Sequence, residues 1–575
     1  MGLKRRLFVL LASASLVAAL FPAAAGAAGP VIPTSYPRDQ TLYTSGTMWG
    51  APTVFNPVTN GYVTGTFGLL YESLFLYNPI SDKFIPWLAQ SGSWTGAKEY
   101  TLKLRSGLTW NDGTPLTADD VIYTFNLGKL SSVPYSTLWN FLQGVTKVDA
   151  VTVKFTFSKA LYQEWSNALY TVAMVPAHVW GTRTATDVLT YNTSPDAAAG
   201  VVGSGPYMLL TYDPTKVVWV KNDAWWGKSL LGLDVKPTYI IDEVNGSNNV
   251  ELGQMLNGTL DLSNNFLPGV NSIVSGIGGY GIQTYYAKPP YMLSANTAWL
   301  VTNDVKKPTN DPVFRRALAE SINVSQIVNN VYGQIVQAAN PTGLLPTWNQ
   351  FVDKSVVAKY GTTYNPTDAK KILAAAGYKM GSDGYFRNKD GSVINLSLIV
   401  PNGWTDWMAA IQSIAQSAKK AGIKITPSFP SYNDRTDKVQ KGNFDLAIAN
   451  DAQIANTPWS YYQWMFRQPI QTVQVAGNDG RYKNPKLWSL IQQLDATPTS
   501  NVAAMKTIIS QIQTIQLQDL PIIPLWYNGA WSQANNNVWT NWPSAAAGSP
   551  HYMPVTWGGY WNMGAVLMLT TLKLK

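Results

Sequence analysis

Residues 101–127 read TLKLRSGLTWNDGTPLTADDVIYTFNL and combine three signals of local structure. Leu102 and Leu104 alternate with basic residues, which is typical of a strand with one buried face. The run Asn-Asp-Gly at 111–113 favours a turn, because Asn and Asp bond their own backbone and Gly accepts positive φ. Thr117 stands three residues before Asp120, a variant of the capping box that opens a helix. We therefore expect a strand, a turn and a capped helix, and we assign these aspartates to turn and cap chemistry rather than to catalysis.

The part of this segment that reads LRSGLTWNDGTPLTADDVIYTF, residues 104–125, resembles the hallmark segment of the family 5 extracytoplasmic solute-binding proteins of ABC importers. That family includes oligopeptide, dipeptide, nickel and oligosaccharide binders. The similarity extends over essentially the whole chain after the leader, for example at Gly-Ser-Gly-Pro-Tyr (203–207) and in the helical segments 311–333 and 365–378. The resemblance implies an α/β fold of the two-lobe periplasmic-binding-protein type II class, with the ligand enclosed by closure of a hinge between the lobes.

The chain divides into a leader and two predicted lobes. Residues 1–28 combine three cations, an apolar run and a small-residue cleavage site, which is typical of a secretory signal peptide. The resemblance implies that lobe I comprises 29–297 and 522–575, with an inserted subdomain at about 76–210, and that lobe II comprises 298–521. In lobe I we expect a helix and a strand within 66–79, and a final strand at 565–572. The last predicted helix covers 501–518.

Composition excludes several functional classes. The net charge of +9 includes three leader cations and no basic run, so nucleic acid is not an expected partner. The chain has no cysteine, which excludes disulfides, thiol catalysis and a lipid anchor on an N-terminal Cys. The two histidines, His178 and His551, lie in different segments, so we expect no metal site and no cofactor. A Gly-x-Ser-x-Gly nucleophile elbow is also missing, and we expect a binding protein rather than an enzyme.

The aromatic content favours a sugar ligand, since 23 Trp and 30 Tyr are present. A flat indole ring can cover the apolar C–H face of a pyranose. The sugar hydroxyls then need polar partners, because unpaired buried polar groups are costly. From the aromatic and polar residues that the resemblance assigns to cleft segments, we predict the ligand-binding residues Trp49, Asn264, Asn265, Phe266, Trp404, Trp407, Asn450, Asp451, Trp459, Tyr462 and Trp531.

One departure from the family pattern also favours sugar over peptide. In peptide-binding members an Asp-Tyr-x-Asp-Pro type segment follows the strand that matches 443–450, and its carboxylate can hold the α-ammonium group of a peptide. Here Thr457 replaces the Asp before Pro458. Without that anion a buried ammonium group is poorly tolerated. The segments 457–462 and 538–544 look more like the cellobiose- and mannobiose-binding branch, although Asp451 keeps a peptide ligand open as an alternative.

The sequence therefore predicts a monomeric extracytoplasmic substrate-binding component of an ABC importer, in the periplasm or on the outer face of the membrane. Its predicted partners are an oligosaccharide and the permease subunits in the membrane. An oligopeptide or dipeptide ligand is the first alternative. A secreted glycan-active enzyme or an adhesin is the second, because distant carboxylates can form a glycosidase pair without any sequence motif.

Overall fold

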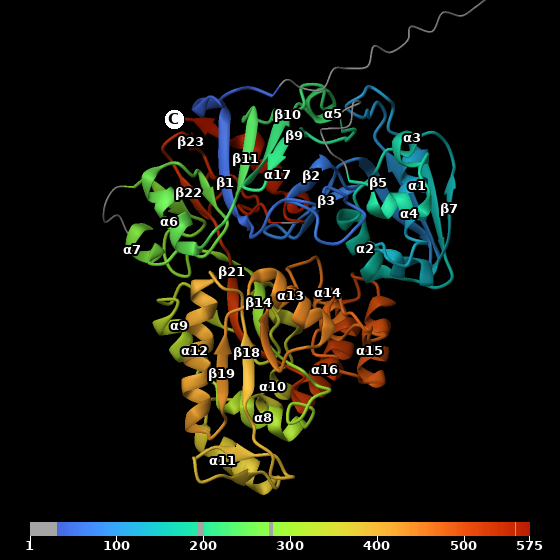
Figure 1. Ribbon diagram of the computed structural model, residues 1–575. Helices are drawn as coiled ribbons and strands as arrows, with labels where there is room; N and C mark the ends of the chain where they lie inside the picture. Colours follow the sequence, from blue (N-terminus) through green and yellow to red (C-terminus); the bar gives the residue numbers. More distant parts are fainter. Residues whose placement is uncertain (1–31, 193–200, 275–279, 558) are drawn as a thin grey trace, which may run out of the picture.

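Two large sheets occupy different halves of the protein (Figure 1). The computed structural model describes residues 32–192, 201–274, 280–557 and 559–575, so the predicted signal peptide lies outside the described residues. We call the described residues of 32–284 and 533–575 the upper half, and residues 293–530 the lower half. The upper sheet has the strand order β13-β22-β12-β1-β11-β10-β9, and the lower sheet has the order β15-β21-β14-β20-β18-β19.

The strand bounds show how far each sheet is assembled from distant segments. The upper sheet is made of β1 (Thr41–Met48), β9 (Tyr207–Asp213), β10 (Lys216–Lys221), β11 (Tyr239–Val244), β12 (Leu262–Ser263), β13 (Ile282–Thr284) and β22 (Gln533–Asn535). The lower sheet is made of β14 (Leu293–Thr302), β15 (Gln337–Ala338), β18 (Leu396–Ile399), β19 (Ile425–Ser428), β20 (Leu446–Ala449) and β21 (Ile522–Ala530). Strands β21 and β22 are consecutive in the chain, yet they belong to different sheets.

The hallmark segment adopts the predicted conformation. Leu102 and Leu104 are fully buried on β6 (Glu99–Leu104). The turn is closed by Asp112, whose Oδ1 accepts a hydrogen bond from the amide of Thr114 at 2.9 Å. Helix α1 (Ala118–Leu127) begins after Thr117, and both hydrogen bonds of the capping box with Asp120 are present. The strand, the turn and the capped helix are all confirmed.

A separate four-stranded antiparallel sheet forms around this segment, in the order β5-β6-β8-β7. It lies with its helices on the right of the upper half (Figure 1). We propose that this region is the inserted subdomain predicted at about 76–210. Its further elements are β3 (Phe75–Asn78), β4 (Lys83–Pro86), β5 (Ala89–Gly96), β7 (Leu142–Lys147), β8 (Thr152–Phe157), α2 (Tyr162–Thr171), α3 (Ala177–Trp180) and α4 (Ala185–Thr190).

Two secondary-structure predictions are wrong. Residues 66–79 form strands β2 (Gly65–Tyr71) and β3 rather than a helix and a strand. Gly68 has φ +100°, and a Cβ there would lie 2.2 Å from the Cβ of Trp561, so this strand depends on glycine. The apolar run 565–572 forms helix α17 (Ala565–Thr571), which follows α16 (Val502–Asp519) as the last helix. A continuous buried apolar run has no periodicity that separates strand from helix.

The chain crosses between the halves twice, at 285–292 and at 531–532. Thr284 pairs with Gln533 in the upper sheet, and Leu293 pairs with Ala530 in the lower sheet, so the two crossings run side by side. The lobe bounds at 297 and 522 remain predictions. Sheet membership supports our proposal to place them at the two crossings, because β14 and β21 then stay whole within one lobe.

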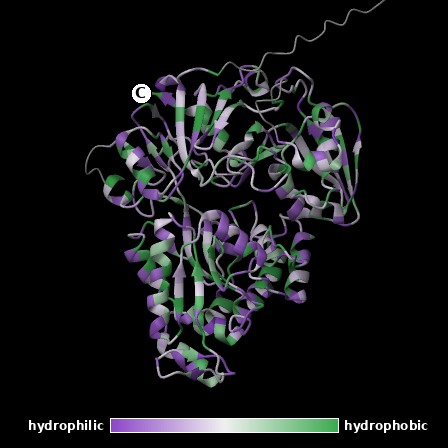
Figure 2. Ribbon diagram, in the orientation of Figure 1, coloured by the Kyte–Doolittle hydropathy of each residue, from purple (hydrophilic) through white to green (hydrophobic). Residues whose placement is uncertain are grey.

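The helices cover the sheets with amphipathic faces. Helix α12 (Thr405–Lys420) buries Trp407, Ala410 and Ile414 and carries both hydrophilic and hydrophobic residues along its length (Figure 2).

No helix among the described residues is long and apolar enough to cross a membrane. The other helices are α5 (Trp226–Leu231), α6 (Asn248–Asn257), α7 (Val270–Val274), α8 (Pro312–Glu320), α9 (Val324–Asn330), α10 (Lys354–Tyr360), α11 (Pro366–Ala375), α13 (Tyr432–Lys441), α14 (Trp459–Phe466) and α15 (Pro485–Asp495).

A buried carboxylate joins three tryptophans in the upper half. Glu72 is 1% exposed, and its Oε1 accepts hydrogen bonds from the indole nitrogens of Trp87 at 2.9 Å and Trp225 at 3.2 Å. Its Oε2 accepts from Trp226 at 2.7 Å. Burial raises the pKa of Glu72 to about 7, although the indole hydrogen bonds favour the charged form. The carboxylate therefore connects the end of β2 with β5 and α5.

We expect Glu72→Gln to lower the free energy of unfolding by about 1–3 kcal/mol, because the amide NH2 of glutamine would face indole donors where a carboxylate oxygen accepts. Urea denaturation followed by circular dichroism measures this change. Glu99→Gln is the control, because Glu99 lies on the same upper half with a side chain 45% exposed, and it should stay within about 0.5 kcal/mol of the wild type. Equal stability of the two variants would contradict the role of Glu72.

Candidate functional site

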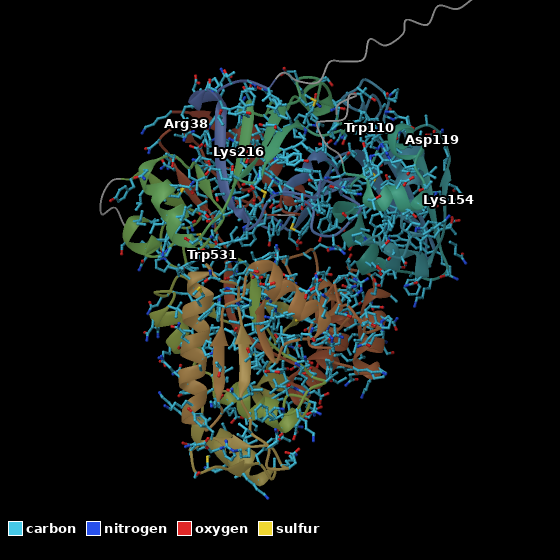
Figure 3. The ribbon with its side chains drawn as sticks, in the orientation of Figure 1. Arg38, Trp110, Asp119, Lys154, Lys216 and Trp531 are labelled. Carbon is cyan, nitrogen blue, oxygen red and sulfur yellow. The ribbon has the colours of Figure 1, made fainter. Side chains whose placement is uncertain are left out.

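A cavity of about 230 Å³ lies between the two halves. The C-terminal end of β1 and the loop after β12 form its upper wall. The N-terminal end of α12, the segment after β20 and the end of β21 form its lower wall. Trp531 lies where the halves meet (Figure 3). The cavity is lined by Gly46, Thr47, Trp49, Asn265, Pro401, Trp404, Asp406, Trp407, Tyr432, Arg435, Asn450, Asp451, Gln453, Asn528, Trp531, Trp557 and Tyr560.

Aromatic rings form much of the cavity wall. Trp49 of the upper half approaches Trp404 of the lower half with ring centroids 5.4 Å apart. Trp404 also meets Trp407 edge to face at 4.7 Å. On the side of the crossings, Trp531 is nearly parallel to Tyr332, with ring centroids 6.3 Å apart and planes 10° apart. Indole rings therefore reach the cavity from both halves and from the crossing between them.

The loop after β12 reaches the cavity because β1 lies very close to it. Gly46 has φ +90°, and a Cβ there would lie 2.8 Å from the carbonyl carbon of Asn264 and 2.9 Å from the Cβ of Asn265. Asn264 itself lies behind the wall, where its carbonyl oxygen accepts a hydrogen bond from Trp557 Nε1 at 2.7 Å. Its side chain accepts from the amide of Thr556 at 3.0 Å. Asn264 thus holds Trp557 in place while Asn265 lines the cavity.

A hydrogen-bond chain joins the two halves beside the cavity. The Nδ2 of Asn265 donates to Asn248 Oδ1 at 2.6 Å, and Asn248 Nδ2 donates to Asp406 Oδ1 at 3.3 Å. Tyr332 donates its hydroxyl to Asp406 Oδ2 at 2.9 Å. Burial raises the pKa of Asp406 to about 6 and that of Glu251, which also accepts from Asn265, to about 7. These carboxyls are therefore held by neutral donors rather than by cations.

Three buried polar atoms of the lining residues have no hydrogen-bond partner among the described residues. They are Nε1 of Trp404, Nε of Arg435 and Oδ1 of Asn528. Arg435 is 9% exposed and Asn528 is 3% exposed. Gln453 differs, since its Oε1 accepts from the hydroxyl of Tyr560 at 2.8 Å and its Nε2 donates to the carbonyl of Asn450 at 2.7 Å. Each of these three atoms is enclosed by the protein and has almost no accessible surface, so none of them faces the open space of the cavity.

The structure brings most of the predicted site residues to this cavity and places the others elsewhere. Phe266 packs edge-on behind Trp531, with centroids 5.5 Å apart, and Asn264 lies behind the wall. Trp459 lines a second cavity of about 320 Å³ between α2 and α14. Tyr462 is fully buried and accepts a hydrogen bond from Gln513 Nε2 at 3.1 Å. The predicted residues that line the first cavity are Trp49, Asn265, Trp404, Trp407, Asn450, Asp451 and Trp531.

Sequence reasoning missed several lining residues. Asp406 lies between two predicted tryptophans on the first turn of α12, so helical spacing was a signal that pointed to it. Arg435 lies on α13, whose many charged residues are typical of an exposed helix, so its burial could not be predicted. Asn528 lies in the mostly apolar strand β21. The lining residues outside the predicted set are Gly46, Thr47, Pro401, Asp406, Tyr432, Arg435, Gln453, Asn528, Trp557 and Tyr560.

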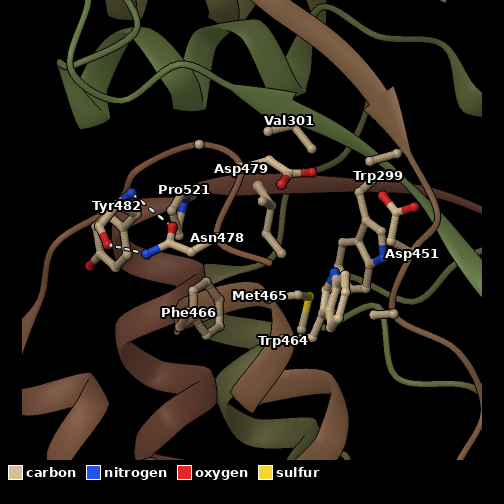
Figure 4. A pocket seen from close by; sticks show the side chains of 14 residues that line it. Trp299, Val301, Asp451, Trp464, Met465, Phe466, Asn478, Asp479, Tyr482 and Pro521 are labelled. Carbon is tan, nitrogen blue, oxygen red and sulfur yellow. Dashed lines mark hydrogen bonds between the residues drawn. The ribbon is translucent and has the colours of Figure 1, made fainter. Parts of the chain in front are cut away.

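A small hollow in the lower half, shown in Figure 4, is not a ligand site. Its volume of about 30 Å³ leaves room for ordered water only. Trp299, Trp464 and Met465 enclose it, with Asp479 at one side. Burial and the neighbouring Asp451 raise the pKa of Asp479 to about 7. Among the described residues, no group of three or more His, Asp or Glu side chains is placed to hold a metal ion.

The chain belongs to the bacterial extracellular solute-binding proteins of family 5, whose model matches residues 83–472. It is therefore a substrate-binding protein of an ABC transporter, and the members of this family bind solutes outside the cytoplasm rather than catalyse reactions. A probable ABC transporter-binding protein of Deinococcus radiodurans is 30% identical over 65% of this chain and 67% of its own length. The peptide transport periplasmic protein SapA of Salmonella typhimurium is 24% identical over 83% of this chain and 85% of its own.

Solved structures agree with this fold. A Thermotoga maritima protein, described as a periplasmic oligopeptide-binding protein with bound mannohexaose, is 42% identical, has a TM-score of 0.89, and covers 94% of this chain and 100% of its own. The oligopeptide-binding protein AppA of Bacillus subtilis, solved with a nonapeptide, is 19% identical with a TM-score of 0.75 and covers 93% of this chain and 99% of its own. The predicted family and the two-lobe α/β fold class are confirmed.

We expect Gly46→Ala to destabilise the protein by about 2 kcal/mol or more, because alanine would be strained at φ +90° and would press on the Asn264–Asn265 backbone. The midpoint of thermal unfolding measures this effect. Gly50→Ala is the matched control, since nothing lies within 4 Å of a Cβ at that position. A Gly46→Ala protein that unfolds at the temperature of the control would contradict the close packing of β1 against this loop.

Proposed function

We propose that this substrate-binding protein captures an oligosaccharide in the cavity between its halves and delivers it to the permease. The observation that carries this proposal is the combination of indole walls with polar side chains such as Asn265, Asn450 and Asp451 in one cavity. Each ring of a sugar presents apolar C–H faces to indoles and hydroxyls that both donate and accept. A ligand of this chemistry matches both kinds of lining side chain, and a buried polar group left unpaired costs about 1–3 kcal/mol.

The relatives support this proposal in part. The Thermotoga protein that is 42% identical to this chain was solved with mannohexaose, although its description also calls it an oligopeptide-binding protein. The binding energy needed is modest, because micromolar affinity corresponds to about −8 kcal/mol. Stacking on two indole rings and several hydroxyl hydrogen bonds are sufficient for that affinity after the costs of association.

An oligopeptide is the second candidate ligand. Asp451 and Asp406 give the cavity two carboxyls, and an exposed carboxylate such as Asp451 can pair with the α-ammonium group of a peptide. Several relatives carry peptide-binding names, SapA and AppA among them. Against this candidate, Thr457 stands where peptide-binding members carry an Asp, and its hydroxyl is buried without a hydrogen-bond partner among the described residues.

The remaining parts of the proposal concern export and assembly. We propose that residues 1–28 are a cleaved signal peptide and that the exported chain works as a monomer. A family 5 binding protein of an ABC transporter requires permease subunits as partners. We propose that the cavity binds its ligand without catalysis.

We expect Trp404→Ala to weaken binding of mannohexaose roughly 10- to 100-fold, because the variant loses an indole platform of the cavity. Isothermal titration calorimetry measures this affinity. Trp488→Ala is the control, because Trp488 lies on α15 and lines none of the cavities described above. Equal affinity of Trp404→Ala and the wild type would contradict the proposed site.

We also expect Asp451→Asn to bind mannohexaose within about threefold of the wild type, because sugars carry no ammonium group that requires a full negative charge. The same calorimetry with a mixture of short peptides tests the alternative. Peptide binding by the wild type that Asp451→Asn abolishes, with no heat from mannohexaose, would replace the sugar with a peptide as the ligand.

A further inference from the structure

Helix α2 of the upper half is held directly against the lower half. It lies at the lower edge of the right-hand part of the upper half, facing α14 and α15 (Figure 1). Gln163 is fully buried, and its Nε2 donates to the carbonyl of Thr497 at 2.8 Å. The Nδ2 of Asn456 donates to the hydroxyl of Ser166 at 2.7 Å. This contact joins the two halves at a place separate from the crossings.

The N-terminus of α2 is capped by the other half of the protein. The residue before the helix, Leu161, has no side-chain acceptor for the free amides of the first turn. Asp495, at the end of α15 and 6% exposed, accepts a hydrogen bond at Oδ1 from the amide of Glu164 at 2.9 Å. A carboxylate at a helix N-terminus satisfies a free donor and interacts favourably with the helix dipole. The lower half therefore completes a helix of the upper half.

The same contact brings two acidic side chains together. Glu164 stands in the first turn of α2, and the hydroxyl of Thr137 donates to its carboxylate. Arg467, at the end of α14, attracts the charge of Glu164, and Lys159 attracts that of Asp495. Neither carboxylate forms an ion pair within 4 Å in the part of the chain that the structure describes. Asp495 is thus buried and Glu164 half-buried beside it, without a direct ion pair for either.

We propose that Glu164 and Asp495 form a proton-linked latch that holds α2 against α15 in the closed protein, so that ligand is retained at lower pH and released more readily as pH rises. This inference rests on the proposed function, because it concerns a cleft that closes on its ligand. It adds a regulation of that cleft at a contact outside the cavity of about 230 Å³, since Glu164 lines the adjoining cavity of about 320 Å³, which shares Asp451 and Gln453 with the first.

The direction of the pH effect follows from the charges at the contact. Burial raises the pKa of Glu164 and of Asp495, and the charge of Glu164 raises the pKa of Asp495 further. In an open protein both side chains would be solvated and their pKa values would return toward the ordinary range. Closure therefore takes up a proton. The latch stabilises the closed protein fully at pH values below the ordinary pKa values of the two carboxyls. This stabilisation is lost as the pH rises through their raised pKa values.

A fluorescence energy-transfer pair across the two halves tests the latch without any ligand. The chain has no cysteine, so V148C and V393C create two unique labelling positions, whose native side chains are 60% and 64% exposed. We expect the transfer efficiency of the ligand-free protein to fall between about pH 5 and about pH 8.5, a range that spans documented pKa values of buried carboxyls. In Asp495→Asn, which keeps an oxygen for the cap and removes the charge, the efficiency should stay high at both pH values.

The same proteins are then titrated with mannohexaose. We expect the affinity of the wild type to fall roughly fivefold or more over this range, and that of Asp495→Asn to change much less. Asp353→Asn is the control, because Asp353 caps α10 within the lower half and should leave both responses unchanged. A pH response equal in Asp495→Asn and wild type, or no response in the wild type, would overturn the latch even if mannohexaose binds. If mannohexaose does not bind but Asp495→Asn abolishes the transfer response, the latch stands and the sugar proposal fails.

Discussion

The two chain crossings between the halves determine where the protein can bind a ligand. Leu293 and Ala530 pair at the top of the lower sheet, and Thr284 and Gln533 pair at the bottom of the upper sheet, so both crossings lie together. Because β14 and β21 are hydrogen-bonded along most of their length, the two crossings stay adjacent, and the halves can rotate about the short segments between the sheets. The cavity lies next to this axis. Its floor near Trp531 belongs to the crossing, while Trp49 and Trp404 belong to opposite halves.

The cavity wall is held in place by hydrogen bonds within the protein. The chain from Asn265 through Asn248 to Asp406 joins the two halves beside the cavity. Each of these side chains is satisfied by a protein partner, so the network does not depend on a ligand. A fixed, satisfied network therefore supports the side chains that a ligand would contact. This arrangement suits a site that must be pre-organised before its ligand arrives.

The sequence was informative where a local rule decides the structure and uninformative where tertiary contacts decide it. Residues 101–127 fold as predicted, because turn chemistry and a helix cap act within a few residues. The run 565–572 is apolar throughout and has no hydrophobic periodicity. Its pattern therefore could not distinguish the helix that it forms from a strand. At the site, Trp404 and Trp407 could be predicted from aromatic load and resemblance. Tyr462 could not be excluded by the same reasoning, because its place in the core is set by α16, far away in the chain. Arg435 was missed, since an arginine on a polar helix gives no sign that tertiary packing buries it.

The most direct measurement is a crystal structure of the mature protein with mannohexaose. We predict density for a sugar in the cavity between the halves, with a ring against Trp404 or Trp531 and hydrogen bonds to polar lining side chains such as Asn265 and Asn450. Sugar density elsewhere on the protein would contradict this prediction. So would a sugar in the cavity whose rings contact none of the lining indoles, because the aromatic wall is the basis for assigning this ligand chemistry.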